Sequence, residues 1–402
     1  MEATDGGDKQ SSSAKTYSVI SFHEKGDTYI QVRDANGHTF LRVHKNLVSA
    51  ISTAWSDKMK DSQAVIIAHD KAEKHDCCHV LKMLDQDDDP IGLIILFQLA
   101  HWKFHDLTDR LTIDELWALA RISHKTECTF LVTPYAERWI VNGLHYQMTV
   151  NGASNDEGKI MVIAWVFGEA RAFAKVLPQV VTNTSLSADG EVLLDRHGNP
   201  WAAQPIPSEL IDMMKAIRLE RLTRVMKTVD GPIHDMLEAN NDFQYCRAKD
   251  SLDIKEACQS QQLGSLMSGL VKVGLLPFPD PHKYLDTITS IAEKLEDIKA
   301  VRYKVPGALP HNDTHITCGA KHKEKIRAIK EEPIRLTYSL AAALKRRGLT
   351  TGAFRHELFS EVQVSEGQFA VDENSFEVTK SPILSTQAWT QEFTANEDSE
   401  EE

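Results

Sequence analysis

Long apolar runs are missing from this 402-residue sequence. The longest, IGLIILFQLA at 91–100, is too short to span the roughly 30 Å hydrocarbon core of a bilayer. The first fifteen residues, MEATDGGDKQSSSAK, also lack the apolar core of a secretory signal. We therefore expect an intracellular protein of the cytoplasm, the nucleus or both, with no membrane partner.

Cysteine is scarce as well, with six in the whole chain. Because no secretory signal is predicted, these cysteines are expected to be reduced rather than paired in disulfides. Reduced cysteines in such a chain are buried thiols or metal ligands. Their positions relative to histidines therefore decide whether the sequence can build a metal site.

Basic residues are outnumbered by acidic ones, 45 against 58, which gives the chain a net charge of −13. Binding to nucleic acid needs a basic face that neutralises phosphates, so this balance disfavours nucleic acid as a partner. Two short basic segments, KHKEK at 321–325 and KRR at 345–347, could form a local nuclear-import or nucleic-acid patch. A solvated helix face is the simpler interpretation of both.

Sequence motifs for common catalytic sites are also missing. The chain contains no G-x-S-x-G, no phosphate-cradling glycine loop and no dinucleotide fingerprint. The aspartates of DQDDDP at 85–90 lack the glycine turn and terminal glutamate of a calcium loop, and acids at the start of a helix explain them better. We expect a protein that is not an enzyme.

Hydrophobic periodicity predicts a mixed arrangement of strands and helices in residues 17–147. TYIQVR alternates polar and apolar side chains, and the turn DANG connects it to a second strand, HTFLRVH. Thr112 and Glu115 form the capping box of a later helix. The other elements expected here are strands at 64–68 and 80–84 and helices at 45–52, 91–102, 111–124 and 130–144.

The chain beyond a polar break at 151–158 is predicted to form a second, mainly helical domain, 155–350. Its first segment, 159–177, is apolar on nearly all sides and is expected to be one buried helix. Both ends, residues 1–16 and the acidic tail 365–402, are expected to be largely disordered. The remaining expected elements are a hairpin at 185–200, helices at 208–229, 262–276 and 284–298, and helical stretches after 322.

Three stretches of the first part resemble a BTB/POZ domain of the form common among filamentous fungal proteins. They are FLRVHKNLV (40–48), DDDPIGLIILFQLAHWKF (87–104) and LTIDELWALARISHKTECTFLVTPYAERWI (111–140). In the third stretch, Cys128, Leu131, Pro134 and Trp139 fill the family's pattern of a helical hairpin that ends in cysteine, an apolar pair, proline and tryptophan. The resemblance implies an α+β fold, a small sheet capped by helical hairpins. The proline usual after His44 is missing, and the segment 69–79 is a long charged insertion.

The resemblance also implies a function in protein–protein interaction. Such domains form homodimers and dock partner proteins, including the cullin scaffold of ubiquitin ligases, so we expect a scaffold or adaptor. A transcription-associated nuclear co-regulator is an alternative that the sequence does not separate from it. Trp117 and Trp139 are candidate interface anchors, because aromatic side chains dominate interface hot spots. Their helical spacing favours a place in the core instead.

Several of these fungal proteins carry a second pattern after the BTB domain, and this chain is similar to it. Cys246, Cys258, the segment LGSLMSGLVKVGLLPFP (263–279) and the pair His315-x2-Cys318 match the pattern in order. The resemblance implies that Cys246, Cys258, His315 and Cys318 bind a structural Zn²⁺, for which three thiolates and one imidazole are a full tetrahedral set. The alternative is that the cysteines are core side chains and His315 lies at the surface.

Other histidines and cysteines give weaker metal hypotheses. His311 or His322 could replace a member of the quartet, and a metal-dependent enzyme using ligands within 246–322 is a further alternative. The spacing His311-x3-His315 occurs in zinc proteases, but Asn312 replaces their catalytic glutamate and nearby prolines argue against a helix. HDCCH at 75–79 is dense in soft ligands, yet it is predicted to lie in an exposed insertion.

Overall fold

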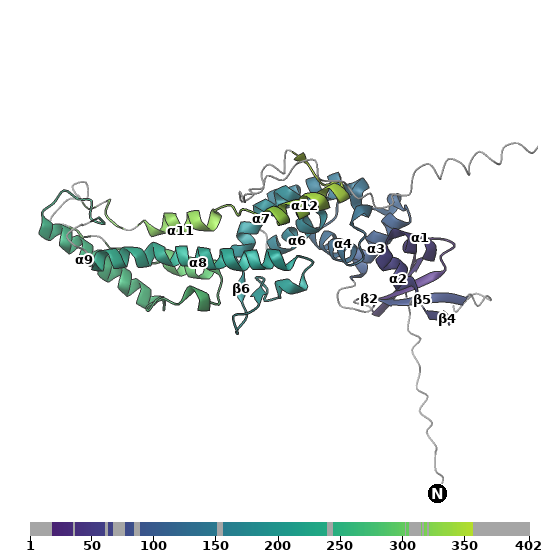
Figure 1. Ribbon diagram of the computed structural model, residues 1–402, viewed down its shortest axis with the longest axis horizontal. Helices are drawn as coiled ribbons and strands as arrows, with labels where there is room; N and C mark the ends of the chain where they lie inside the picture. The colour runs from purple at the N-terminus through teal and green to yellow at the C-terminus, as the bar shows by residue number, and fades with distance from the viewer. Residues whose placement is uncertain are drawn as a thin grey trace, which may run out of the picture. The chain divides into compact units, whose positions relative to one another are not determined.

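Five strands near the N-terminus form one sheet in the computed structural model of the protein (Figure 1). They are β1 (Ser18–Ser21), β2 (Thr28–Asp34), β3 (Gly37–Val43), β4 (Gln63–Ile66) and β5 (Cys77–Met83). In the order β1-β3-β2-β5-β4, β1 is parallel to β3 and β2 to β5, whereas β2–β3 and β4–β5 are antiparallel. The sheet is therefore mixed, with β1 and β4 at its edges.

The structure describes residues 18–34, 37–60, 63–66, 77–83, 89–150, 156–238, 244–301, 303–304, 315, 317–319 and 321–356. The predictions for residues 1–16 and for the tail 365–402 lie outside this part of the chain. So do most of the predicted insertion 69–79 and most of the polar break at 151–158. The domain limits stay predictions.

The antiparallel pairing of β2 with β3 confirms the expected hairpin, because the strands pair as far as Asp34 opposite Gly37. In β2, Ile30 and Val32 are fully buried, while Gln31 between them is only half-buried. Successive side chains of a strand point to opposite faces, which explains the alternation. The apolar face of the sheet therefore lies against the helices that follow.

Helices make up most of the remaining described chain, so the protein is a mixed α+β protein in which helix predominates. The α-helices are α1 (Lys45–Ile51), α2 (Thr53–Lys60), α3 (Pro90–Ala100), α4 (Ile113–Lys125), α5 (Asn142–Val150), α6 (Glu157–Phe167), α7 (Ala170–Thr182), α8 (Ser208–Leu237), α9 (Leu252–Lys272), α10 (Ile288–Glu296), α11 (His322–Glu331) and α12 (Tyr338–Thr351). None of the helices in the described ranges is long and apolar enough to cross a membrane.

Short elements complete the described chain. They are the 3-10 helices η1 (Phe104–Asp106), η2 (Thr129–Tyr135), η4 (Trp201–Ala203) and η5 (Pro281–Lys283), the π-helix η3 (Ala136–Val141), and the strands β6 (Ser185–Leu186) and β7 (Leu193–Leu194). β6 and β7 pair antiparallel and confirm the hairpin predicted within 185–200. The capping box of α4 is confirmed too, since Thr112 and Glu115 bond each other's backbone N–H.

The apolar segment 159–177 forms two helices instead of the single one expected. α6 ends and α7 begins on either side of Gly168, which has a left-handed φ of 76°. The Glu169 carboxylate then accepts a hydrogen bond from the Ala172 N–H and caps α7. Hydrophobic periodicity does not register such a break, because a left-handed glycine ends a helix without changing the apolar pattern around it.

The single helix expected at 130–144 is also wrong. η2, η3 and the start of α5 follow one another there, so the backbone passes from a tight to a wide helical turn. Pro134 lies inside η2 and has no N–H to donate, which disturbs regular α-helical bonding. Other limits differ as well, since α9 begins at Leu252 rather than 262 and α8 extends to Leu237 rather than ending at 229.

One large hydrophobic cluster packs the sheet, α1 to α4, α6 and α7 together with the start of α8 and α12. Trp139 belongs to it with 1% of its surface exposed, and its indole N–H donates to the Thr108 carbonyl at 3.1 Å. Trp117 is half-buried under Arg121, whose guanidinium carbon lies 4.6 Å from the centre of the indole ring. Both tryptophans therefore support the core and are poor candidates for interface anchors.

A second hydrophobic cluster joins the later part of α8 to α9, α10 and α11. Two buried arginines on α8 connect these helices through backbone carbonyls. Arg218 donates to the Tyr284 carbonyl at 2.8 Å, and Arg221 donates to the Lys330 carbonyl at 3.3 Å at the C-terminal end of α11. A cation at that end complements the helix dipole. These contacts hold the segment before α10 and the end of α11 against α8.

Candidate metal centre

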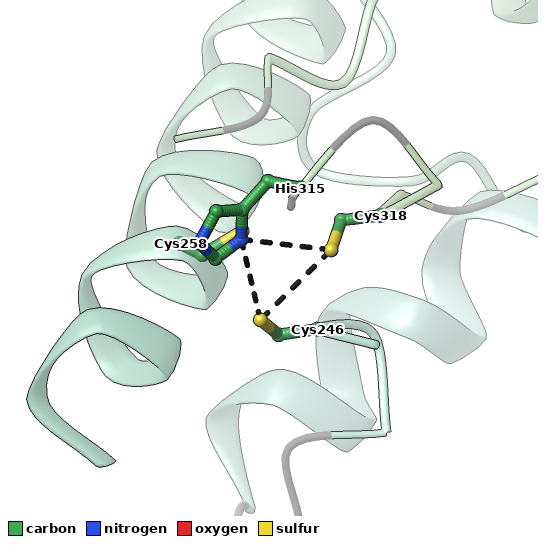
Figure 2. A group of neighbouring side chains, drawn as sticks. All are labelled: Cys246, Cys258, His315 and Cys318. Atoms are coloured by element: carbon green, nitrogen blue, oxygen red, sulfur yellow. Dashed lines mark hydrogen bonds between the residues drawn. The ribbon is translucent and has the colours of Figure 1, made fainter. Parts of the chain in front are cut away.

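Four metal-ligating side chains from three segments of the chain meet beside α9 (Figure 2). They are Cys246, Cys258, His315 and Cys318. Cys258 lies on α9, Cys246 lies in the segment that precedes this helix, and the other two lie in a turn before α11. The Cys318 N–H donates to the His315 carbonyl at 2.9 Å and so closes that turn.

The ligand atoms of the four side chains all lie within 4.8 Å of one another. His315 Nδ1 is 3.5 Å from Cys246 Sγ and 3.6 Å from Cys318 Sγ, and these two sulfurs are 3.9 Å apart. A disulfide needs an S–S distance of about 2.05 Å, so the cysteines are free thiols in this arrangement.

These distances fit a tetrahedral zinc site. With Zn–S bonds of about 2.3 Å and Zn–N bonds of about 2.0 Å, tetrahedral angles place two sulfurs about 3.8 Å apart and a sulfur and a nitrogen about 3.5 Å apart. The three distances measured between His315, Cys246 and Cys318 differ from these values by about 0.1 Å. These three atoms are therefore spaced as they would be around one ion, and Cys258 Sγ lies within 4.8 Å of each of them.

The site is largely shielded from solvent. Cys258 and His315 have no exposed surface, Cys246 is 5% exposed and Cys318 is half-buried. The Tyr303 ring meets the His315 ring edge to face, with 5.8 Å between the ring centres. Burial of this kind excludes competing water, and it requires that every polar atom of the site find a partner.

Hydrogen bonds from the surroundings reach two of the sulfurs. The Gln262 side-chain amide donates to Cys258 Sγ at 3.3 Å, and the Arg247 backbone N–H donates to Cys318 Sγ at 3.3 Å. On the other side of the imidazole, His315 Nε2 lies 3.1 Å from the Asp250 carboxylate. Donors at the sulfurs and a carboxylate at the histidine are the usual surroundings of a thiolate–imidazole metal site.

Without an ion, the environment favours the protonated thiol. Burial, with smaller contributions from the Cys258 and Cys318 thiols, raises the pKa of Cys246 to about 12. A bound zinc ion acts in the opposite direction, because coordination deprotonates a thiol outright. Burial therefore disfavours a free thiolate at Cys246, whereas coordination to a cation would stabilise the thiolate.

Of the alternative ligands, His322 lies elsewhere. It is buried on α11, and its Nε2 atom is 3.1 Å from the Ile298 carbonyl, so it does not replace a member of the quartet. His311 lies outside the described residues. β5 begins at Cys77, so the end of HDCCH is strand rather than the exposed insertion expected, paired through Cys78 with Val65 of β4. That correction arises because β4 supplies a partner strand that local sequence does not reveal.

The residues predicted from the sequence for this site do not include Asp250 and Gln262, which both contact its ligands. The sequence does contain an indication for Gln262, because it lies four positions after Cys258 and residues at that spacing face the same side of a helix. There is none for Asp250, since its contact with His315 joins residues that only the fold brings together. Acids are common in this sequence, and no local pattern distinguishes this one.

No protein-family model matches the chain, and no curated protein or solved structure matches it either. The resemblance to BTB/POZ proteins therefore remains a prediction, and the centre is interpreted from its own residues. Three thiols and one imidazole form a soft to borderline ligand set, and such sets suit zinc better than magnesium or calcium.

Proposed function

We propose that this protein is a non-enzymatic scaffold or adaptor that binds a protein partner through residues 17–147 and stabilises its helical region with a structural Zn²⁺. The observation that carries the proposal is the complete ligand set of the metal centre. A catalytic zinc keeps a position for water or substrate beside three protein ligands. Here four side chains offer one ligand atom each, enough to fill a tetrahedron, so the ion would support folding and leave no position for substrate.

The surroundings of the centre explain why an ion would be needed there. Among the described residues, the apolar cluster at this place comprises Cys246, Ala248 and Cys258, with Tyr303 and Cys318 packed against it. So small a cluster removes little apolar surface from water. An ion that joins Cys246 to Cys318, 72 positions later, adds the free energy of metal binding to that of folding.

The metal part of the proposal predicts one zinc ion per chain in the purified full-length protein. Elemental analysis should find this ratio in the wild type, and Cys318→Ser should lower it well below one. Cys128→Ser is the matched control, because Cys128 is buried but belongs to the first hydrophobic cluster. Absence of zinc from the wild type would contradict the proposed structural ion. A zinc held by three side chains and a water molecule would instead favour the alternative of a metal-dependent enzyme.

Exposed aromatic side chains after α3 support the partner-binding part of the proposal. Trp102, directly after α3, has 61% of its surface exposed and a left-handed φ of 54°. Phe104 is 43% exposed, and its ring centre lies 6.1 Å from that of Tyr135, which stacks on Trp139 at 4.2 Å. An exposed tryptophan on a supported loop is typical of an interface anchor.

We expect Trp102→Ala to weaken partner binding at least tenfold, because removing a central tryptophan from an interface costs about 2 kcal/mol or more. Light scattering and sedimentation of the full-length chain measure homodimer formation, and calorimetry with a purified cullin N-terminal domain measures the other expected interaction. Phe130→Ala, which also removes an exposed aromatic ring, is the control. A wild type that neither self-associates nor binds the cullin would contradict this assignment, as would equal binding by Trp102→Ala.

A further inference from the structure

We propose that Asp250 positions His315 for the metal and sets which of its ring nitrogens carries the proton. The proposal rests on the proposed zinc site, but it assigns a role to a residue outside the four ligands. Asp250 lies in the segment between Cys246 and α9, and 25% of its side chain is exposed. It is therefore a partly buried carboxylate beside a group of thiols, where an unpartnered negative charge would be unfavourable.

The two nitrogens of the imidazole face different neighbours. Nδ1 lies 3.5 Å and 3.6 Å from the sulfurs of Cys246 and Cys318. Nε2 lies 3.1 Å from Asp250 Oδ2. Because the nitrogens of an imidazole point away from each other, only Nδ1 is available to the metal and only Nε2 to the carboxylate. The ring therefore connects the ligand group to Asp250.

This geometry selects one tautomer. A neutral imidazole has one N–H, and a carboxylate is an acceptor only, so Asp250 holds the hydrogen on Nε2. The lone pair of Nδ1 is then directed at the sulfurs, where a cation would accept it. In the opposite tautomer the Nδ1 hydrogen would point at the metal, and the Nε2 lone pair would face the carboxylate.

The position of the ring is constrained as well. His315 has no exposed surface, and the plane of the Tyr303 ring stands at 80° to that of the imidazole. Without Asp250, the buried Nε2–H would lose the carboxylate that lies 3.1 Å away, which is unfavourable in a site with little access to water. A carboxylate beside the second ring nitrogen is also the usual way in which a metal-binding histidine is oriented.

Charge explains why the carboxylate is tolerated. Three thiolates and Zn²⁺ carry a net charge of −1, to which Asp250 adds another. Gln262 donates a hydrogen bond to Cys258 Sγ, and the Arg247 backbone N–H donates one to Cys318 Sγ. These two N–H groups offset part of the negative charge at the sulfurs. The imidazole N–H lies between the carboxylate and the metal and offsets another part.

The test compares zinc affinity of the full-length protein and its Asp250→Ala and Asp250→Asn variants by competition with a chromophoric chelator. Loss of such a carboxylate typically weakens metal binding about 10–100-fold, so we expect this loss for Asp250→Ala. Asp250→Asn keeps the shape and one acceptor oxygen and should fall between Asp250→Ala and the wild type. Asp253→Ala, a nearby exposed acid in the first turn of α9, is the control and should bind like the wild type.

The spectrum of the Co²⁺-substituted protein provides a readout that a general loss of stability would not move. We expect the bands of Asp250→Ala to shift while the stoichiometry stays at one ion per chain. Equal zinc affinity and an unchanged cobalt spectrum in both variants would overturn the role of Asp250 and leave the metal site standing. A wild type without zinc would overturn the metal site itself, so the two failures are distinguishable. If Asp250→Ala does not fold, Asp250→Asn alone decides.

Discussion

Cys258→Ala is expected to abolish tight zinc binding and to lower the free energy of unfolding by several kcal/mol. An ion that binds only the folded chain stabilises it in proportion to the logarithm of its affinity, so a thousandfold weaker site costs about 4 kcal/mol at constant free zinc. Cys258 lies fully buried within α9 and accepts a hydrogen bond from Gln262. Urea unfolding of the full-length protein, with and without a chelator, measures the effect.

The control for this experiment is Cys128→Ala, which removes a thiol of equal burial far from the metal centre. Both variants lose apolar contacts, but the chelator should destabilise the wild type and Cys128→Ala and leave Cys258→Ala almost unchanged. Equal destabilisation of the two variants, with no effect of the chelator on any of the proteins, would show that Cys258 is only a core side chain.

The second large effect is expected for Gly168→Ala, at the break between α6 and α7. A Cβ atom there would lie 1.9 Å from the Gly348 backbone nitrogen and 2.4 Å from its Cα atom, so α12 would have to move. The left-handed φ of 76° adds a penalty of about 1 kcal/mol, and forcing extra volume into a packed contact adds about 1–3 kcal/mol. We therefore expect a loss of about 2–4 kcal/mol of stability.

Gly198→Ala separates the penalty of the left-handed φ from the cost of the close contact with Gly348. Gly198 has a similar φ of 83°, but no atom lies within 4 Å of the position that a Cβ atom would take. Its substitution should cost only the conformational penalty of about 1 kcal/mol. Chemical denaturation of both variants measures the difference. If both lose the same stability, the close approach of α6 and α12 is not what requires glycine at position 168.

Local signals predicted those parts of the fold that neighbouring residues decide. The hairpin at 34–37 follows from its turn residues, and the start of α4 follows from Thr112 and Glu115, because each feature needs contacts over only a few positions. Two of the predictions that were wrong depended on distant contacts. The break at Gly168 belongs to the packing against Gly348, and the early start of β5 belongs to its pairing with β4.

The same distinction between local and distant contacts applies to the candidate metal centre. Cys246, Cys258, His315 and Cys318 were selected by a resemblance between sequences, and the structure brings them together. The contact with Asp250 could not be selected, since one acid among 58 carries no local mark. The choice of Nδ1 over Nε2 is likewise beyond any sequence pattern, because it depends on how the ring is oriented in the folded chain.

The amino-acid pattern alone identifies the four candidate metal ligands and their order, the apolar faces of the strands and helices, and the acidic balance that disfavours nucleic acid. The proximity of the four ligand atoms, within 4.8 Å of one another, and the contact of Asp250 with His315 follow from the folded arrangement of the chain. The physical reason is the range of the interactions. Periodicity and capping act within a helical turn or a strand pair, whereas a metal site forms only when helix packing joins segments about 70 positions apart.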